Sequence, residues 1–222
     1  RWVVGAVAHN VPWISDRPLS PTDFDAAVGG SRLQERWFHL AERTGGALVD
    51  NSAAGVEREM RWAETRFRGF VADRTAEVAR RIWMSGDPKR PWLLVIDRFH
   101  GTVEHSWTNS FLLPAIDTME GGDGGRWHGA LAGGMELALA TATDRQMTLE
   151  QEAKFWCRNY AEKEPALWLR FGGTMAAGLR AFAFVPSLAG APPVVNLQVA
   201  DGRAVLTLDG RERWCCDAPS ES

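Results

Sequence analysis

The feature that most constrains this sequence is a series of short β-branched and aromatic runs, each closed by a turn signal. The run at 92–96 (WLLVI) is followed by Asp97, and the run at 179–185 ends at Pro186. A continuous apolar run of this length indicates a strand that is buried on both faces. Turn signals recur about every 8–12 residues, a spacing typical of sandwiches rather than of βαβ units. The sequence therefore predicts an all-β fold, one large antiparallel β-sandwich.

The C-terminal third predicts a hairpin. Residues 194–199 alternate apolar and polar side chains, and residues 203–208 form a second β-rich run. Asp201-Gly202 lies between the two runs, and Asp-Gly is a favoured pair for a tight turn between antiparallel strands. A second hairpin is expected in the middle of the chain, because residues 101–107 follow the run at 92–96 at hairpin distance.

Two segments leave their local structure open. Residues 73–82 combine a cap-like Asp73 with good helix formers and apolar residues at four-residue spacing, which favours a helix. The alternative is a strand with the apolar residues of this segment on one face, although Arg80 interrupts that face. Residues 144–156 fit either a short helix or a surface loop.

One domain accounts for almost the whole chain. At 222 residues and 45% hydrophobic content, the chain is long enough to enclose a core. No internal repeat, low-complexity tract or shift in composition marks a second domain, so residues 1–214 are predicted to form the sandwich and residues 215–222 a disordered tail. The first residues contain no initiator Met and do not resemble a signal peptide. We therefore expect the chain to be a fragment of a longer protein.

Charge and composition narrow the partners. The formal net charge of −3 excludes a highly basic nucleic-acid binder. No apolar run approaches the roughly 20 residues of a membrane span. We therefore expect neither nucleic acid nor a membrane as a partner. Only three of the 25 basic residues are Lys, which leaves 22 Arg, and 11 residues are Trp. Arginine suits forked recognition of carboxylate or sulfate, and exposed Trp suits stacking on sugar rings. The competing explanation is codon bias together with ordinary core Trp.

Several stretches resemble the C-terminal β-sandwich region of the heparinase II/III-like polysaccharide lyases. They are AHNV at 8–11 with SDRPLS at 15–20, RPWLLVIDRFHG at 90–101 with EH at 104–105, and NYAEKEPA at 159–166 with FAFVP at 182–186. The landmarks occur in the order that the family has them and span about residues 8 to 186. The resemblance implies the large antiparallel sandwich that follows an N-terminal (α/α) toroid in these enzymes.

The resemblance also implies an activity. These lyases split uronate-containing acidic polysaccharides, for example heparan sulfate, a glycosaminoglycan, or alginate, by β-elimination. The Tyr and His that do most of the proton transfer lie on the toroid, and the sandwich forms one wall of the cleft. We therefore expect the sandwich portion of a bacterial lyase, inactive without its toroid and with no catalytic residue assigned here. Acidic polysaccharide and the toroid are the expected partners, and the periplasm or the outside of the cell is the expected location.

His9 is the candidate metal ligand. In the family a structural zinc is held by a His and an Asp upstream and by the His of the AHN segment, which His9 matches. Zinc takes three or four N, O or S ligands, so we expect zinc in the full-length protein and none in this chain alone. The competing interpretation of His9 is a hydrogen-bonded strand histidine. His105 and Tyr160 are both interpreted as structural residues.

Two other functions stay open. The chain fits a free-standing carbohydrate-binding sandwich whose Trp and Arg side chains face an anionic glycan, and it fits an architectural sandwich of an inactive family member. The presence of a helical domain in the longer protein would distinguish the lyase hypothesis from the binding-module hypothesis. The presence of Tyr and His in the cleft of that domain would distinguish it from the architectural hypothesis.

Overall fold

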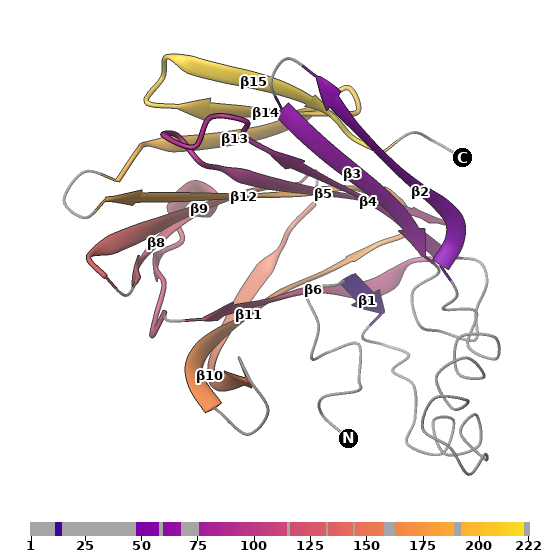
Figure 1. Ribbon diagram of the computed structural model, residues 1–222. Helices are drawn as coiled ribbons and strands as arrows, with labels where there is room; N and C mark the ends of the chain where they lie inside the picture. The colour runs from indigo at the N-terminus through magenta and orange to yellow at the C-terminus, as the bar shows by residue number, and fades with distance from the viewer. Residues whose placement is uncertain are drawn as a thin grey trace, which may run out of the picture.

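The computed structural model describes residues 12–14, 48–57, 60–67, 76–114, 116–131, 133–143, 145–157, 163–188 and 192–219. These residues form antiparallel strands and one short 3-10 turn, η3 (Asp123–Gly125). Figure 1 shows the strands stacked in three layers. The predicted all-β class and antiparallel sandwich are confirmed, and no described helix is long and apolar enough to cross a membrane.

The middle layer is an eight-stranded sheet in the order β2-β3-β4-β5-β12-β9-β8-β7. Its strands are β2 (Leu48–Glu57), β3 (Met60–Phe67), β4 (Ala76–Met84), β5 (Leu93–Gly101), β12 (Gly178–Leu188), β9 (Met135–Thr143), β8 (Arg126–Leu131) and β7 (Glu120–Gly121).

One outer layer lies on each face of this sheet. The lower layer in Figure 1 is a four-stranded sheet in the order β1-β6-β11-β10, with β1 (Pro12–Ile14), β6 (His105–Pro114), β11 (Lys163–Met175) and β10 (Thr148–Cys157). The upper layer is the three-stranded sheet β13-β14-β15, with β13 (Val195–Ala200), β14 (Arg203–Leu208) and β15 (Glu212–Asp217).

The central strands are apolar on both faces because both faces are covered. On β5, Leu94 and Ile96 belong to the core cluster that includes Leu206 of the three-stranded sheet. Val95, between them, belongs to the cluster formed with the four-stranded sheet. The doubly buried strand predicted at 92–96 is therefore confirmed.

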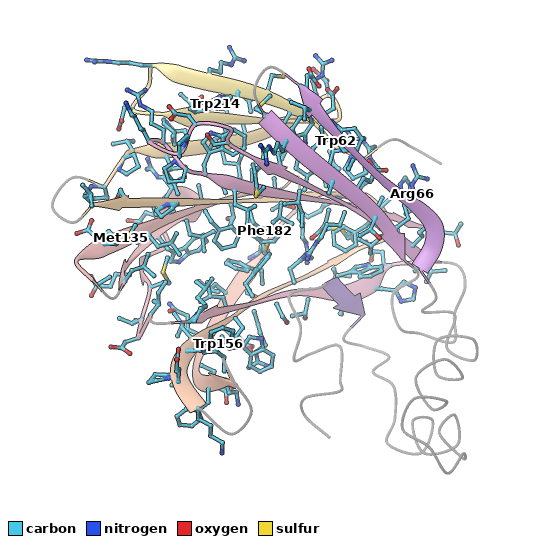
Figure 2. The ribbon with its side chains drawn as sticks, in the orientation of Figure 1. Trp62, Arg66, Met135, Trp156, Phe182 and Trp214 are labelled. Atoms are coloured by element: carbon cyan, nitrogen blue, oxygen red, sulfur yellow. The ribbon has the colours of Figure 1, made fainter. Side chains whose placement is uncertain are left out.

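Aromatic rings fill the space between the middle and the four-stranded sheets. Phe182 of β12 lies with its ring centroid 4.9 Å from that of Phe111 on β6 and 5.0 Å from that of Phe171 on β11. Figure 2 shows Phe182 between these two layers and Trp214 in the three-stranded layer. Trp214 packs on Trp92, with 5.3 Å between the centroids, at the edge of the other core cluster.

The predicted C-terminal hairpin is confirmed. Strands β13 and β14 pair antiparallel, and the turn follows the pair Ala200–Arg203. Asp201 and Gly202 both have positive φ, 51° and 72°, as a tight two-residue turn requires.

The structure decides one open segment and corrects two expectations. For the segment at 73–82, left open between helix and strand, the described residues from Ala76 onward form β4, which lies between β3 and β5. The segment at 144–156 is neither a helix nor a surface loop, because Thr148–Cys157 forms β10. The expected hairpin between 92–96 and 101–107 does not form, since β5 belongs to the eight-stranded sheet and β6 to the four-stranded sheet.

The sandwich continues past residue 214, which was the predicted end of the domain. β15 runs to Asp217, Cys216 is buried in the core cluster under the three-stranded sheet, and Ala218 is buried with it. These residues continue the sandwich instead of starting a tail.

Candidate functional site

The one site residue predicted from the sequence is His9, the candidate metal ligand. His9 and Tyr160 both lie outside the described residues. Among the residues that the structure describes, no three His, Cys, Asp or Glu side chains are grouped so that they could hold a metal ion. Zinc binding through His9 in a longer protein stays a prediction.

The described histidines have three different surroundings. His105 begins β6 and is buried, with its ring edge-on to Trp107 at 6.3 Å between centroids, in agreement with a structural role. His128 is exposed on β8, and its Nε2 lies 3.8 Å from a carboxylate oxygen of Glu120. His100, near the end of β5, lines an open pocket.

A group of charged and polar side chains is enclosed between the middle and four-stranded sheets. The Asp97 carboxylate accepts hydrogen bonds from Nε and Nη2 of Arg80, at 2.6 and 2.7 Å, and from Nδ2 of Asn109 at 2.5 Å. The Asn109 side-chain oxygen in turn accepts a 2.8 Å bond from Nη1 of Arg180. That same Nη1 also donates to the carbonyl oxygen of Trp107 at 3.1 Å. This group joins the two sheets from inside and is closed to a ligand.

Much of the arginine surplus is used within the protein. Described guanidiniums of four strands form ion pairs with carboxylates of the same chain. The pairs are Arg80–Asp97, Arg66 and Arg81 with Glu64, Arg170–Glu150 and Arg203–Asp217. Trp83, Trp92, Trp107 and Trp168 are buried. For these four Trp side chains the explanation by an ordinary core is confirmed.

One pocket of about 750 Å³ combines cationic side chains with an open mouth. It lies where the end of β5 and the start of β12 meet the three-stranded sheet. Arg98, His100 and Arg203 line it, together with the carboxylates of Asp201 and Asp217. We take this pocket, called the Arg98–Arg203 pocket below, as the candidate site.

The β13–β14 turn gives the pocket its shape. A Cβ atom at Gly202 would lie 3.2 Å from Nη2 of Arg98, so glycine allows the guanidinium to approach the turn as well as supplying the positive φ. The Ala218 backbone N–H donates to the Gly202 carbonyl at 3.0 Å, which holds the end of β15 against the same turn.

Arg203 is held by Asp217 across the β14–β15 pair. Its Nε donates to Oδ1 of Asp217 at 2.8 Å. This hydrogen bond and the charge of the carboxylate raise the pKa of Arg203 above its usual value, and Cys215 adds to the effect. The guanidinium is therefore positively charged and oriented at the mouth of the pocket.

A second pocket, of about 560 Å³, has a different chemistry. Trp127 and Phe171 form part of its wall, and residues 122–125 contribute glycines. None of the described residues that line it carries a charge. It suits a neutral ligand, whereas the Arg98–Arg203 pocket carries charges of both signs, the guanidiniums of Arg98 and Arg203 beside the carboxylates of Asp201 and Asp217. Its guanidiniums are groups that can bind carboxylate or sulfate through paired N–H donors. Apart from the Asp-Gly turn, no local sequence pattern indicates the Arg98–Arg203 pocket, because the segments that form its walls are distant in the chain.

Comparison with known proteins gives a structural match. No protein-family model matches the sequence, and no curated protein matches it. The structure of a heparinase III, the BT4657 gene product, superposes with a TM-score of 0.68 at 10% identity, covering 97% of this chain and 31% of that chain. The chain has the fold of that heparinase III region. A second crystal structure of heparinase III gives a TM-score of 0.62 at 12% identity, with 97% of this chain and 30% of that chain covered.

A related solved structure gives the same result. The heparan sulfate lyase HepC from Pedobacter heparinus superposes with a TM-score of 0.56 at 14% identity, covering 84% of this chain and 32% of that chain. The present chain thus spans about a third of the length of the solved structures that it matches. The resemblance predicted from the sequence motifs is confirmed at the level of the fold.

Proposed function

We propose that this chain is the sandwich portion of a polysaccharide lyase that cleaves uronate-containing acidic polysaccharides by β-elimination. The observation that carries the proposal is the structural match to heparinase III, which extends over nearly the whole chain. The sequence landmarks, which occur in the order that the family has them, support it as well, because they depend on the residues and not on the fold.

β-Elimination needs groups that we assign to two different parts of such a protein, the sandwich and the toroid. β-Elimination needs a base for the proton next to the uronate carboxylate, an acid for the leaving oxygen, and a positive group beside the carboxylate as charge develops on it. The described residues include no Tyr, and His105 is buried. In the part of the chain that the structure describes, the candidate site supplies guanidinium groups, beside the carboxylates of Asp201 and Asp217. The proton transfers are assigned to a helical toroid in the longer protein.

The Arg98–Arg203 pocket is the proposed contact of the sandwich with the polymer. Its volume of about 750 Å³ lies within the roughly 300–1,000 Å³ typical of ligand sites. Guanidiniums bind carboxylate and sulfate through paired N–H groups. Asp217 fixes the orientation of Arg203, so a polysaccharide anion would meet a preformed donor.

The function is tested by following the ultraviolet absorbance of unsaturated uronate product on heparin, heparan sulfate and alginate. We expect product from the longer protein that contains the toroid and none from this chain alone. If the longer protein is folded and yields no product on any polymer, the lyase proposal is wrong. The carbohydrate-binding and architectural functions would then replace it.

The role of the pocket is tested with a matched pair of arginine variants in the longer protein. Arg203→Ala removes a donor at the pocket mouth, whereas Arg213→Ala removes an exposed arginine of β15 that does not line the pocket. We expect R203A to raise the KM for the polymer about tenfold or more, since a hydrogen bond to a charged group contributes about 1.5–3 kcal/mol, and R213A to leave it unchanged. Equal KM values for the two variants would exclude the pocket as a contact.

A further inference from the structure

Strands of all three layers of Figure 1 line the second pocket, of about 560 Å³, which is called the Trp127 pocket below. The middle sheet contributes Trp127 of β8 and residues 141–143 of β9. The four-stranded sheet contributes residues 148–149 of β10 and Phe171 of β11, and the three-stranded sheet contributes residues 197–200 of β13. All of the lining residues belong to the described part of the chain. The volume lies within the roughly 300–1,000 Å³ typical of ligand sites.

Trp127 gives this pocket an aromatic wall that the core covers only in part. Its ring lies edge-on to that of the buried Phe171, with 5.6 Å between the centroids, yet Trp127 itself is half-buried. Gly122 lies beside the nitrogen edge of the indole, since a Cβ atom at Gly122 would be 3.3 Å from Nε1 of Trp127. The ring is therefore held by the core and by the loop, and it offers the pocket an apolar surface with an N–H donor.

The polar groups of the Trp127 pocket are hydroxyls and one side-chain amide. They belong to Thr141, Thr143, Thr148 and Gln198. Oγ1 of Thr143 accepts a 3.2 Å hydrogen bond from the backbone N–H of Arg145, and its own proton is left to donate. The exposed amide of Gln198 can both donate and accept. Uncharged groups of these kinds exchange hydrogen bonds with the hydroxyls or the amide of a neutral ligand.

A carboxylate or sulfate would be disfavoured in this pocket. None of its described lining residues carries a charge, and an anion that leaves water without a cationic partner loses its solvation. An uncharged sugar ring, in contrast, combines a face of C–H bonds, which packs on an aromatic ring, with hydroxyls around its edge. The lining of the Trp127 pocket therefore fits an uncharged sugar better than a uronate.

The Trp127 pocket adjoins the Arg98–Arg203 pocket at the end of β13. Residues 197–200 line the first pocket, and the next residues in the chain, 201–203, line the second. The middle sheet gives the same relation, because Thr143 of β9 lines the first pocket and Leu179 of the neighbouring strand β12 lines the second. A polysaccharide bound along the end of β13 would therefore present nearby sugars to two pockets of different chemistry.

We propose that the Trp127 pocket is a subsite for an uncharged sugar ring, a hexose or an N-acetylhexosamine, that neighbours the acidic sugar bound at the Arg98–Arg203 pocket. This inference rests on the proposed function, which supplies the acidic polysaccharide. It adds a selectivity for the polymer. A chain in which uronate alternates with an uncharged sugar fits both pockets, whereas a chain of uronate alone places a carboxylate in the neutral pocket.

The test measures the binding of two tetrasaccharides to this chain. One alternates glucuronate with N-acetylglucosamine, and the other consists of uronate alone. Titration followed by saturation-transfer NMR gives the Kd of each tetrasaccharide and identifies the sugar rings that contact the protein. Binding is measured without cleavage, so the result does not depend on lyase activity.

Two variants remove different contacts of the Trp127 pocket, and a third is the matched control. Trp127→Ala removes the aromatic wall, and Gln198→Ala removes an exposed amide outside the core. Asn196→Ala changes an exposed residue two positions away on the same face of β13, one that does not line the pocket. Circular dichroism checks the fold of each variant. Gln198→Ala carries the test alone where the loss of the Trp127 ring unfolds the protein.

We expect this chain to bind the alternating tetrasaccharide about tenfold or more tightly than the uronate one, because the neutral pocket disfavours a carboxylate. Saturation transfer should be strong at an N-acetylglucosamine ring. Trp127→Ala should bring the ratio of the two Kd values close to one, Gln198→Ala should reduce it about threefold, since a neutral hydrogen bond contributes about 1 kcal/mol, and Asn196→Ala should leave it unchanged.

Equal Kd values for the two tetrasaccharides would overturn the subsite, even where the longer protein is an active lyase. A ratio that both folded pocket variants retain, or the absence of saturation transfer to N-acetylglucosamine, would overturn it as well. A ratio that the pocket variants lose, together with a longer protein that yields no unsaturated product, would support the subsite as part of a binding module and remove the lyase function.

Discussion

Asp97 accepts three hydrogen bonds inside the sandwich, two from the guanidinium of Arg80 and one from the side-chain amide of Asn109. Arg180 is buried beside them and donates to the Asn109 oxygen. Removing the carboxylate takes the ion-pair partner from the buried guanidinium of Arg80 and one acceptor from the Asn109 amide. The geometry therefore stabilises the junction between the two sheets only as long as all four side chains are present.

Asp97→Ala is expected to lower the free energy of unfolding by about 3–5 kcal/mol, since breaking a buried ion pair leaves an uncompensated charge. The measurement is urea denaturation followed by tryptophan fluorescence. Glu150→Ala is the matched control, because it breaks the exposed Arg170–Glu150 pair, and pairs of that kind contribute about 0–1 kcal/mol. An effect of D97A as small as that of E150A would contradict the account of the buried group.

The two neighbouring cysteines differ in burial. Burial, followed by the charges of Cys215 and Asp217, raises the pKa of Cys216 from 9.0 to about 12, whereas Cys215 is exposed. We expect iodoacetamide at pH 8 to modify Cys215 in the folded protein and to leave Cys216 unmodified, as peptide mass spectrometry would show. Modification of both thiols at equal rates would contradict the placement of Cys216 in the core.

The same pKa shift predicts a dependence of stability on pH. The unfolded thiol loses its proton above about pH 9, whereas the folded thiol keeps it up to about pH 12. Above pH 9 the unfolded state therefore binds fewer protons, and stability falls as the pH rises between the two values. Cys216→Ala should lose less stability over this range than the parent protein, as measured by thermal denaturation at pH 8 and pH 10.5. Equal losses in both proteins would show that Cys216 does not contribute.

At the scale of the element, charged core residues explain why β4 could not be assigned from sequence. Arg80 interrupts the apolar face of a strand over 76–84, and that interruption favoured a helix. In the structure the same side chain points toward Asp97 of β5, a partner 17 residues away that no local pattern identifies. β10 is a similar case. Its outward residues Glu150 and Glu152 form ion pairs with Arg170 of β11, and without that partner their charges are typical of a surface loop.

The β13–β14 turn, in contrast, could be predicted from its local sequence. The Asp201-Gly202 pair predicted the β13–β14 hairpin, and the structure confirms it. The contact of this turn with Arg98 could not be predicted, because it depends on how the three-stranded sheet lies on the middle sheet.

Glycine variants separate the two contributions of this turn. Gly202→Ala and Gly210→Ala both place a side chain at positive φ, 72° and 66°, which costs about 1–2 kcal/mol. Only at Gly202 does the new Cβ approach another side chain, Nη2 of Arg98 at 3.2 Å, whereas nothing lies within 4 Å at Gly210. We expect G202A to lower the melting temperature more than G210A. A larger effect of G210A would contradict the close packing of Arg98 on the turn.

At the scale of the molecule, the three-layer arrangement was only partly predictable. Apolar runs indicated strands buried on both faces, which requires a layer on each side of the sheet. The order of eight strands in the middle sheet, and the passage of the chain from β5 into the four-stranded sheet at β6, depend on contacts between distant segments. The candidate pocket depends on the same contacts, since β5, the β13–β14 turn and the end of β15 all form its wall.

Two findings at this scale bear on the proposed function. The fold matches about a third of a heparinase III, and the described residues form an open pocket in which arginines lie beside carboxylates. The proposed lyase would use this pocket to contact the polymer.

The mass balance of the cleavage products tests the proposed function most directly. The longer protein is incubated with a uronate-containing oligosaccharide of defined mass, and the masses of the products are measured by mass spectrometry. β-Elimination predicts that the product masses add up to the substrate mass, with one fragment carrying an unsaturated uronate. Products whose summed mass exceeds that of the substrate by one water per cut would show hydrolysis, and would contradict the account.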